Sequence, residues 1–493
     1  MKTAQLFKVF PQLKWGQAST AEVLDITQDS RSVKPGSVFV AVRGTSGDGH
    51  DFLGAVVRAG AIALVVEDDS NIPTDYQGAV VKVASTRLAL EMLADRFFGE
   101  PAQKLFCVGI TGTNGKTTTA YMVERILTEF GWQTGVMGTI DHHLGERQWT
   151  SGLTTPDPLT LRRRLKEFVS LGAQAAVFEV SSHALTQSRV DRLPFSVGIF
   201  TNFTRDHLDY HRSMEEYFAA KERLFNELLG QAVVRVAILN ADDPMVRKVR
   251  VREGVETWSF GQKDADFLFR ILKSDMAGSL FHLSTPHGNV EIDLPCVGFH
   301  NVYNATAAAA AGVAAGASLK TVQAALKGFF GAPGRLERVD NSRGAHIFVD
   351  YAHTDDALDS VLRSLRELKS VNGSKGRIIT VFGCGGDRDK GKRPLMAQAA
   401  ARHSDVLIMT SDNPRTEDPE QILSEIAAGL PKNWAGEVHF EVDRRQALSL
   451  SLQLAQEGDV ILVAGKGHED YQIIGQERRH FSDVETLTEL LRG

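Results

Sequence analysis

Cysteine is scarce in this sequence. The chain has 493 residues and 3 cysteines, Cys107, Cys296 and Cys384, and none of them is paired at Cys-x-x-Cys spacing. Disulfide-stapled secreted domains and structural zinc sites need more cysteines than this, at closer spacing. The sequence therefore indicates a reducing compartment, with neither a disulfide framework nor a zinc site.

Long hydrophobic runs and an excess of positive charge are also missing. No apolar run approaches membrane-spanning length, and the N-terminal stretch MKTAQLFKVFPQLKWGQ is too interrupted for a signal peptide. The net charge of −6 and the pI near 6.2 are unlike those of a general nucleic-acid binder, although they allow a local anion pocket. We therefore expect a cytoplasmic protein with no membrane insertion and no nucleic-acid partner.

What the sequence does contain is a repeated alternation of apolar strands and helices. A hydrophobic content of 43% is ample for folded cores, and the length suggests about three domains. Continuous apolar runs indicate mostly parallel sheets that are buried on both faces. We expect an α/β protein with a small N-terminal α/β domain at 1–102, a central P-loop ATPase-like domain at 103–332 and a C-terminal Rossmann-like domain at 333–493.

The segments that carry this prediction are short and have clear boundaries. Strands are expected at SVFVAVRG, AIALVVED and AVVKVAS in the first domain, and at KLFCVGI, AAVFEV, VGIFTN and VAILNA in the second. An alanine-rich helix is expected from Asn304, and the glycine-rich stretch GFFGAPGRLERV supplies the next boundary. The third domain is expected to repeat the pattern with strands RIITVFG, DVLIMT and DVILVAG.

A phosphate-binding loop is indicated directly after KLFCVGI. The residues from Thr111 to Thr118 read TGTNGKTT and precede a helix whose apolar residues recur at i, i+3, i+4 and i+7. Backbone amides at such a helix start bind phosphate oxygens, so Lys116 would contact the β- and γ-phosphates and the Thr117 hydroxyl would ligate Mg²⁺. The usual pattern has glycine where this chain has Ile110, and the alternative is a plain glycine-containing turn.

The variant GITGTNGKTTT closely resembles the ATP loop of the Mur ligases, the amide-forming enzymes of peptidoglycan precursor synthesis, and of the related folylpolyglutamate synthetases. The resemblance extends over almost the whole chain, through several further motifs in the same order. It is strongest to the members that add the third residue of the stem peptide. It implies a cytoplasmic ATP-dependent ligase of the peptide synthase type, acting in cell wall biogenesis and thereby in cell shape and cell division.

The resemblance implies a magnesium site to which three residues outside the phosphate loop contribute. Glu179 ends AAVFEV and matches a magnesium-binding glutamate, and His207 in TNFTRDHLDYH matches a histidine ligand of a second magnesium. Lys221 in EEYFAAKERLF matches a lysine that CO₂ converts into a carbamate, an anion suited to a site with two metal ions. The alternatives from the residues alone are a helix-capping glutamate, a satisfied core histidine and a lysine on a solvated helix face.

Further ATP contacts are implied by motifs beyond the loop. GFHNVYNATAAA matches an HNxxN pattern whose asparagines suit the edge of the adenine base, although a helix start is the alternative. An arginine in APGRLER and an aspartate in FVDYAHTDDAL match residues near the nucleotide, and Asp355 stands where the family usually has proline. The expected ATP-binding residues are Gly112, Thr113, Asn114, Gly115, Lys116, Thr117, Thr118, His300, Asn301, Asn304, Arg335 and Asp350.

The UDP-sugar substrate is assigned to the first domain by the same resemblance. QDSRSVKPGSVFVAV resembles a loop that contacts uridine diphosphate, and the following TSG turn resembles one that closes over the nucleotide, although both are also ordinary surface turns. GLTTPDP and VSSHALTQSRV would hold the peptide arm. The expected UDP-N-acetylmuramoyl-dipeptide residues are Gln28, Ser30, Thr45, Ser46, Gly47, Thr154, Thr155, Ser181, Gln187 and Arg189.

The incoming amino acid is expected to bind in the third domain. MTSDNPRTEDPEQIL places Arg415 behind Pro414, where a buried strand meets solvent, and arginine offers a carboxylate two parallel donors. In the family, DNPR at this position accompanies meso-diaminopimelate as the substrate. Diaminopimelate has a distal carboxylate, which is absent from lysine. The alternative is a simple surface turn. The expected contacts are Arg388, Asp412, Asn413, Pro414, Arg415, Gly465 and Glu469, of which Glu469 would accept from the distal ammonium.

These features favour one reaction over three alternatives. The chain is expected to add meso-diaminopimelate to UDP-N-acetylmuramoyl-L-alanyl-D-glutamate through an acyl phosphate, as a monomer using ATP and Mg²⁺. A folylpolyglutamate synthetase would lack the UDP-binding first domain and the DNPR loop. A P-loop switch or motor would have no use for the HNxxN and DNPR motifs. A silent UDP-sugar binding protein would not need Lys116, Glu179, His207 and Lys221 together.

Overall fold

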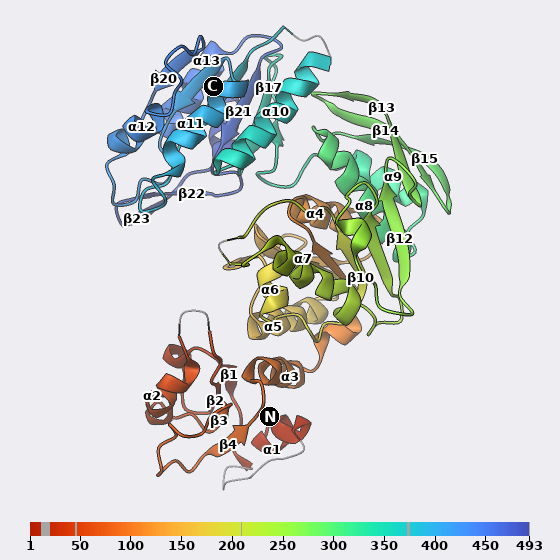
Figure 1. The fold of residues 1–493 in the computed structure, drawn as a ribbon, viewed down its shortest axis with the longest axis vertical. Coiled ribbons are helices and arrows are strands. Elements are labelled where there is room, and N and C mark those ends of the chain that lie inside the picture. The colour runs from red at the N-terminus through yellow and green to blue at the C-terminus, as the bar shows by residue number, and fades with distance from the viewer. Residues whose placement is uncertain (11–19, 45–46, 209, 372–374, 493) are drawn as a thin grey trace. The chain divides into compact units, whose positions relative to one another are not determined.

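The computed structural model describes residues 1–10, 20–44, 47–208, 210–371 and 375–492. These residues form two compact units, one of residues 1–267 with 307–318 and the other of residues 268–306 with 319–493. Figure 1 labels the helices and strands along the chain. Within the described residues, no helix combines the length and the apolar character that crossing a bilayer requires.

The first unit opens with a small parallel sheet. Its strands lie in the order β1-β2-β3-β4, with bounds Asp25–Thr27, Ser37–Val40, Ala63–Val66 and Ala79–Lys82. Helices α1 (Thr3–Leu6), α2 (Leu53–Arg58) and α3 (Thr86–Phe98) flank it. Valine-rich runs such as β3, which is buried throughout, form strands because branched side chains pack well on a pleated surface. The strands predicted in this region are confirmed.

A larger sheet follows in the same unit, in the order β12-β11-β10-β5-β9-β6-β7-β8. The strands from β12 to β6 are parallel, as predicted, whereas β7 and β8 form an antiparallel edge that the sequence did not reveal. The strand bounds are β5 Phe106–Thr111, β6 Thr134–Met137, β7 Asp141–Leu144, β8 Arg147–Thr150, β9 Ala175–Glu179, β10 Phe195–Phe200, β11 Val236–Asn240 and β12 Glu256–Gly261.

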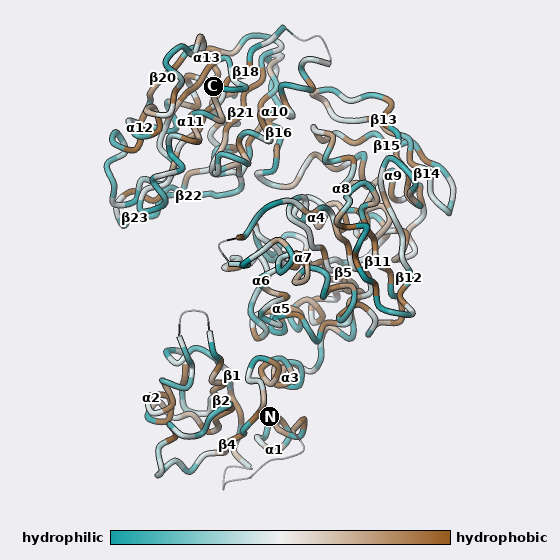
Figure 2. The backbone as a smooth tube through the Cα atoms, viewed as in Figure 1, coloured by the Kyte–Doolittle hydropathy of each residue, from teal (hydrophilic) through white to brown (hydrophobic). Residues whose placement is uncertain are grey.

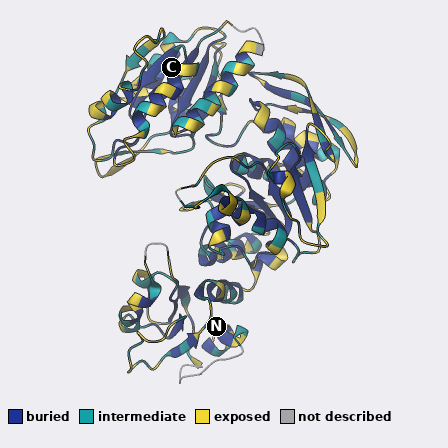
Figure 3. Cartoon of the chain, in the orientation of Figure 1, coloured by how far each residue is buried: buried dark blue, intermediate teal, exposed yellow. Residues whose placement is uncertain are grey.

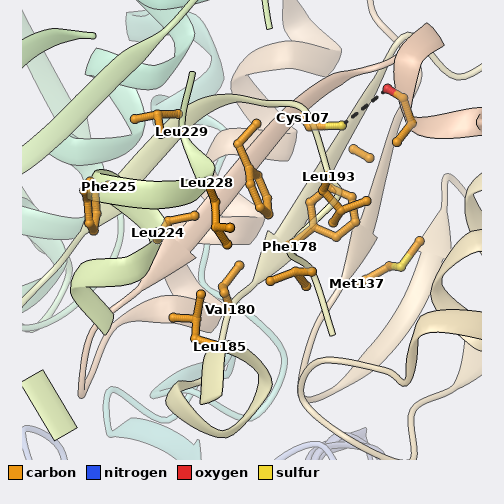
Figure 4. Close-up of a cluster of buried hydrophobic side chains, with 14 of the residues drawn as sticks. Cys107, Met137, Phe178, Val180, Leu185, Leu193, Leu224, Phe225, Leu228 and Leu229 are labelled. Atoms are coloured by element: carbon orange, nitrogen blue, oxygen red, sulfur yellow. Dashed lines mark hydrogen bonds between the residues drawn. The ribbon is translucent and has the colours of Figure 1, made fainter. Parts of the chain in front are cut away.

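Helices α4 (Lys116–Glu129), α5 (Pro158–Ser170), α6 (Ser182–Thr186) and α7 (Met214–Arg223) accompany this sheet. The core between them is apolar, and Figure 4 shows Phe178, Leu193 and Leu224 among its buried side chains. The strands appear as brown, hydrophobic segments in Figure 2 and as dark blue, buried ones in Figure 3. A buried sheet places its functional groups at the strand ends, because only there does the chain reach solvent.

Buried charges connect helix α3 to helix α5 in this unit. The Arg162 guanidinium is fully buried and donates to Asp95 Oδ1 at 2.8 Å and to Glu91 Oε2 at 2.9 Å. It also donates to the Arg189 carbonyl oxygen at 3.1 Å, while Arg192 pairs with Asp95 at 2.8 Å. Buried charges are tolerated when they are paired and hydrogen-bonded in this way. The network therefore holds the segment that carries Arg189 against the N-terminal helix α3.

The second unit begins with an antiparallel meander of β13 (Phe267–Asp275), β14 (Gly278–Thr285) and β15 (Gly288–Leu294), which was not predicted. Helix α8 (Phe299–Ala314) is the predicted alanine-rich helix, but it begins at Phe299 instead of Asn304. Gly298, at φ +101°, precedes it in a conformation that L side chains rarely adopt. Helix α9 (Leu319–Lys327) packs against β15.

The C-terminal sheet has the order β16-β17-β21-β18-β19-β20 and is parallel apart from β16. The bounds are β16 Glu337–Val339, β17 His346–Asp350, β18 Ile378–Phe382, β19 Val406–Met409, β20 Glu437–Phe440 and β21 Val460–Ala464. A hairpin of β22 (Tyr471–Ile474) and β23 (Glu477–His480) follows β21. The helices are α10 Asp355–Val371, α11 Lys392–His403, α12 Pro419–Ala427, α13 Arg444–Leu454 and α14 Asp483–Arg492. The three strands predicted here are confirmed.

Candidate functional site

The predicted phosphate loop lies between β5 and α4, which is the strand–loop–helix context that such a loop requires. Gly112 has φ +145° and Gly115, at the start of α4, has φ +84°. The Lys116 ammonium donates to the carbonyl oxygens of Gly112 at 3.0 Å and Thr113 at 2.8 Å. Ile110 is buried within β5 and pairs with both neighbouring strands, so the glycine of the usual pattern is not needed there. The loop presents backbone amides and a cation to an anion.

Glu179 lies beside this loop, where β9 ends. Its carboxylate accepts from Thr117 Oγ1 at 3.0 Å, and from the amide and hydroxyl of Thr139 at 2.8 and 3.0 Å. The side chain is buried. Oxygen donors of this kind, a carboxylate beside a hydroxyl, are those that Mg²⁺ prefers. Thr139 was missed by the sequence reasoning, because it lies in a connection without a recognisable motif.

Lys221 is buried, whereas a lysine on a helix is ordinarily expected on the solvated face. Its side chain donates to the Gly112 carbonyl oxygen at 2.8 Å and lies 4.6 Å from the centre of the Tyr217 ring. Burial holds its pKa well below the usual value, and the positive charge of Lys116 lowers it further. The helical spacing contained the signal, since Lys221 falls four residues after the buried Tyr217 and three before the buried Leu224.

Lys221 differs from the other large cations buried in this protein. Arg162 pairs with Glu91, Arg393 with Glu417 and Arg444 with Asp483, each within 2.9 Å. Lys221 makes no ion pair with any carboxylate in the part of the chain that the structure describes. A buried ammonium without a counter-charge is costly, so the neutral amine is favoured at this position.

His207 also lies near Tyr217, with ring centroids 5.8 Å apart. Its backbone has φ +53°, and its ring is 5.1 Å from that of His183. Its Nε2 is 3.6 Å from Asp206 Oδ2, and the side chain is 39% exposed, so it is not a core histidine. No three His, Cys, Asp or Glu side chains converge on a common point within the described residues. A metal here would need other donors in addition.

The residues expected to hold the peptide arm form one hydrogen-bonded chain that starts at Glu179. The Thr155 hydroxyl donates to the Glu179 carbonyl oxygen at 2.7 Å and accepts from the Ser181 amide at 3.0 Å. Arg189 donates to the Thr155 carbonyl oxygen at 2.7 Å and to Gln187 Oε1. Thr154 joins through its hydroxyl, 3.1 Å from that of Thr139. The structure thus brings all five expected residues beside the candidate metal site.

The residues expected to hold the UDP group lie in the small N-terminal sheet. Gln28 and Ser30 follow β1, and the turn that contains Gly47 follows β2, so both loops lie at the carboxyl edge of a parallel sheet. Thr45 and Ser46 fall outside the described residues. A Cβ placed on Gly47 would meet no atom within 4 Å, which is consistent with an open turn.

The remaining predicted nucleotide contacts belong to the second unit. Asn301 and Asn304, in the first turns of α8, are buried; Asn301 Nδ2 donates to the Val297 carbonyl oxygen at 2.8 Å, and Asn304 Nδ2 donates to Asn301 Oδ1 at 3.1 Å. His300, in the same turn, is exposed. Asn301 therefore supports the helix start, the alternative that the sequence left open.

Arg335 and Asp350 lie near each other in the C-terminal domain. Burial raises the pKa of Asp350, while the charge of Arg335 opposes the shift. The Asp350 oxygens accept from the amides of Leu336 and Ala352 at 2.7 and 2.8 Å, so this aspartate also fixes the connection to the domain. Asp355 is the first residue of α10, where a carboxylate favours the helix start.

Two arginines meet at one glycine in the C-terminal domain. A Cβ on Gly385 would lie 2.9 Å from Arg415 Nη1 and 3.8 Å from Arg388 Cγ. Arg415 has φ +52° and donates through Nη1 to the Gly386 carbonyl oxygen at 2.7 Å. Among the described residues, neither arginine pairs with a protein carboxylate. The two arginines belong to the loops that follow β18 and β19.

The acidic members of the expected pocket lie next to it. Asn413 Nδ2 donates to Glu469 Oε2 at 3.1 Å. Gly465 has φ +114°, and a Cβ added to it would lie 3.9 Å from Asp412 Oδ2. Lys466, which the sequence analysis did not single out, is fully buried between Asp412 and Glu469. The structure therefore brings the residues that were expected to bind the amino acid onto three loops, which follow β18, β19 and β21. The loop after β19 carries both a carboxylate, Asp412, and an arginine, Arg415.

Comparisons with known proteins agree with this arrangement. Three domain families match in order: the Mur ligase family catalytic domain at residues 23–98, the Mur ligase middle domain at 110–312 and the Mur ligase glutamate ligase domain at 334–467. The chain is 43% identical over 510 residues to the UDP-N-acetylmuramoyl-L-alanyl-D-glutamate--2,6-diaminopimelate ligase of Geobacter metallireducens, with 100% of this chain and 98% of that protein covered.

Two further relatives carry the same name. The protein of Geobacillus kaustophilus is 42% identical over 487 residues, covering 98% of each chain. A solved structure of such a ligase superposes with a TM-score of 0.72 at 32% identity, covering 99% of this chain and 98% of that one. The similarity therefore spans the N-terminal, middle and C-terminal domains.

The packing of the phosphate loop generates a first prediction. Gly112→Ala should abolish ATP binding, because its Cβ would fall 1.9 Å from Thr201 Oγ1 at a backbone angle that disfavours alanine. Gly131→Ala is the matched control, with a similarly positive φ but no atom within 4 Å of the added carbon. Calorimetric titration with ATP should detect binding by the control alone. Wild-type affinity in Gly112→Ala would contradict the loop geometry.

Proposed function

The chain is a member of the Mur ligase family, and we propose that it joins meso-diaminopimelate to the D-glutamate γ-carboxylate of UDP-N-acetylmuramoyl-L-alanyl-D-glutamate, with ATP converted into ADP and phosphate. The observation that carries this proposal is full-length similarity at 43% identity to a relative of that name, over 100% of this chain. The site supports it, because its phosphate loop, peptide-arm residues and arginine pair are the parts that the reaction needs.

The first step forms an acyl phosphate. A γ-carboxylate oxygen attacks the γ-phosphorus of ATP and ADP leaves, so negative charge accumulates around the transferred group. Lys116 and the amides at the start of α4 oppose that charge, and the phosphate loop needs no enzymic nucleophile. Arg189 and Thr155 would hold the peptide arm, since their network begins at Glu179 beside the loop. In the second step the amine attacks the acyl carbon, phosphate leaves and the amine loses a proton.

Magnesium fits the donor set in the first unit. The Glu179 carboxylate and Thr117 hydroxyl lie 3.0 Å apart in a buried setting, and His207 and a modified Lys221 would complete two sites. Bound Mg²⁺ supplies positive charge that neutralises the phosphate oxygens. Thr139 orients the carboxylate through its amide and hydroxyl, which leaves Glu179 in one fixed position.

Lys221 is suited to carbamylation by its surroundings. Only a neutral amine can attack CO₂; the nitrogen forms the N–C bond and releases one proton, giving a carbamate anion. Burial and Lys116 lower the pKa of Lys221, which favours the neutral amine. No carboxylate among the described residues forms an ion pair with Lys221, and a carbamate there would place an anion near Lys116, whose ammonium donates to the same Gly112 carbonyl oxygen.

The arginine pair supports diaminopimelate as the amino acid. Diaminopimelate has a carboxylate at its far end, whereas lysine has only an ammonium there. Arg415 would bind this carboxylate through parallel hydrogen bonds, with Arg388 beside it at Gly385. Glu469 and Asp412 would accept from the distal ammonium. A P-loop motor would have no use for such a pocket.

The organisation proposed for the enzyme follows from these assignments. Residues 1–102 would bind the UDP group, 103–332 would bind ATP and 333–493 would bind the amino acid. We place the enzyme in the cytoplasm, because its 3 cysteines are unpaired, and we expect it to act as a monomer on small-molecule substrates.

Loss of the Lys221 amine tests the modification. Lys221→Ala should lose most activity, and added short-chain carboxylates should restore part of it, because their oxygens can replace those of the carbamate. Lys116→Ala is the control. It should stay inactive, because added carboxylates cannot replace the lost Lys116 ammonium. Intact mass of the native protein should show one added CO₂. An unmodified lysine in an active, magnesium-loaded enzyme would exclude the carbamate.

Truncation of Arg415 tests the substrate assignment. Arg415→Ala should weaken transition-state binding of diaminopimelate by about 2–5 kcal/mol, which is the cost of truncating one partner of a buried charge pair. This loss is measured as a fall in kcat/KM for diaminopimelate. KM for ATP and for the UDP-dipeptide should hardly change. Arg415→Lys should recover only part of the wild-type kcat/KM for diaminopimelate, because an ammonium lacks the planar pair of donors.

The exposed Arg445, which pairs with Glu489 at the surface, provides the matched control. Arg445→Ala should leave the ratio of kcat/KM for diaminopimelate to that for lysine unchanged, whereas Arg415→Ala should reduce it. An equal ratio in wild type and Arg415→Ala would mean that the DNPR segment is only a turn.

A further inference from the structure

A fully buried ammonium lies in the amino-acid pocket. Lys466, between β21 and β22, has an exposed side-chain fraction of 0%. Its Nζ donates to the Tyr471 carbonyl oxygen at 2.6 Å and to Asn413 Oδ1 at 3.2 Å. It lies 3.2 Å from Asp412 Oδ1 and 3.8 Å from Glu469 Oε2. One cation thus touches three side chains assigned to the amino acid.

These contacts join two loops that come from different strands. Asn413 Oδ1 also accepts from the Ile473 amide at 2.9 Å, and Gln472 Nε2 donates to the Asp412 carbonyl oxygen at 2.8 Å. The Arg415 amide donates to the Ile473 carbonyl oxygen at 3.0 Å. The loop after β19 is therefore fixed to strand β22, with the Lys466 ammonium at the centre of the junction.

The same ammonium sets the charge of the pocket. Burial raises the pKa of Glu469, the charge of Asp412 raises it further, and Lys466 opposes both effects. Replacing Lys466 by a neutral side chain would make the pocket more negative by one charge. Diaminopimelate has two ammonium and two carboxylate groups and no net charge. Lysine has two ammonium groups and one carboxylate, and therefore one net positive charge. A more negative pocket therefore penalises diaminopimelate relative to lysine.

We propose that Lys466 is a positioning and specificity-determining residue, whose cation holds the loop after β19 against β22 and balances Asp412 and Glu469 so that the pocket accepts a zwitterion without net charge. The specificity part rests on the proposed function, since it assumes that this pocket binds diaminopimelate. The positioning part concerns the folded chain alone. The two parts therefore need separate readouts.

Hydrogen exchange tests the positioning part without any substrate. In Lys466→Met, the amides of residues 411–413, 415 and 471–474 should exchange at least about tenfold faster than in wild type, because the junction loses the Lys466 contacts. Lys432→Met, an exposed lysine of the same domain, is the control and should exchange like wild type. Unchanged exchange in Lys466→Met would overturn the positioning role.

Kinetics test the specificity part on the full-length enzyme. Lys466→Met should raise KM for diaminopimelate and lower the diaminopimelate-to-lysine ratio of kcat/KM by about tenfold or more, with KM for ATP nearly unchanged. Lys466→Arg keeps the charge, so its ratio should stay within about threefold of wild type even if the larger side chain slows the reaction. This variant carries the test if Lys466→Met does not fold.

The outcomes separate this inference from the proposed function. Faster exchange with an unchanged ratio would mean that Lys466 is structural only and would overturn the specificity part. A lost preference in Lys466→Arg would do the same, because the charge is still present. Failure of the wild-type enzyme to use diaminopimelate would contradict the proposed function, while the exchange experiment would still decide the positioning role.

Discussion

One buried carboxylate connects the two halves of the chemistry. Glu179 accepts from Thr117 at the start of the phosphate-loop helix and from Thr139, while its own carbonyl oxygen accepts from Thr155. The phosphate loop and the segment proposed to hold the peptide arm therefore share a single anchor at the end of β9. Because β9 lies beside β5 in a parallel sheet, the geometry of that anchor is fixed by strand pairing and not by a flexible loop.

Buried charge is used in different ways along the chain. Arg162 and Arg444 are saturated by carboxylates, and their role is to hold helices and loops in place. Lys466 is also paired, and its partners Asp412 and Glu469 are residues expected to bind the amino acid. Among the described residues Lys221 makes no ion pair with a carboxylate, and its amine donates to the Gly112 carbonyl oxygen beside the Tyr217 ring.

Much of the fold could be predicted because its parallel strands are continuous apolar runs. The antiparallel meander β13–β15 was missed because strands such as β15 are largely exposed and alternate weakly. The position of Arg415 after a buried strand could be read from the sequence, whereas its meeting with Arg388 at Gly385 depends on pairing between β18 and β19. Thr139 and Lys466 could not be found, because the contacts that place Thr139 at Glu179 and Lys466 at Asp412 and Asn413 are made between residues distant in sequence.

The most direct test of the account is product analysis with the wild-type enzyme. Incubated with ATP, Mg²⁺, UDP-N-acetylmuramoyl-L-alanyl-D-glutamate and either diaminopimelate or lysine, it should form the UDP-tripeptide with diaminopimelate. ADP and phosphate should appear in equal amounts with that product, and lysine should be incorporated poorly. ATP hydrolysis that does not depend on the UDP-dipeptide, or equal incorporation of lysine, would contradict the account.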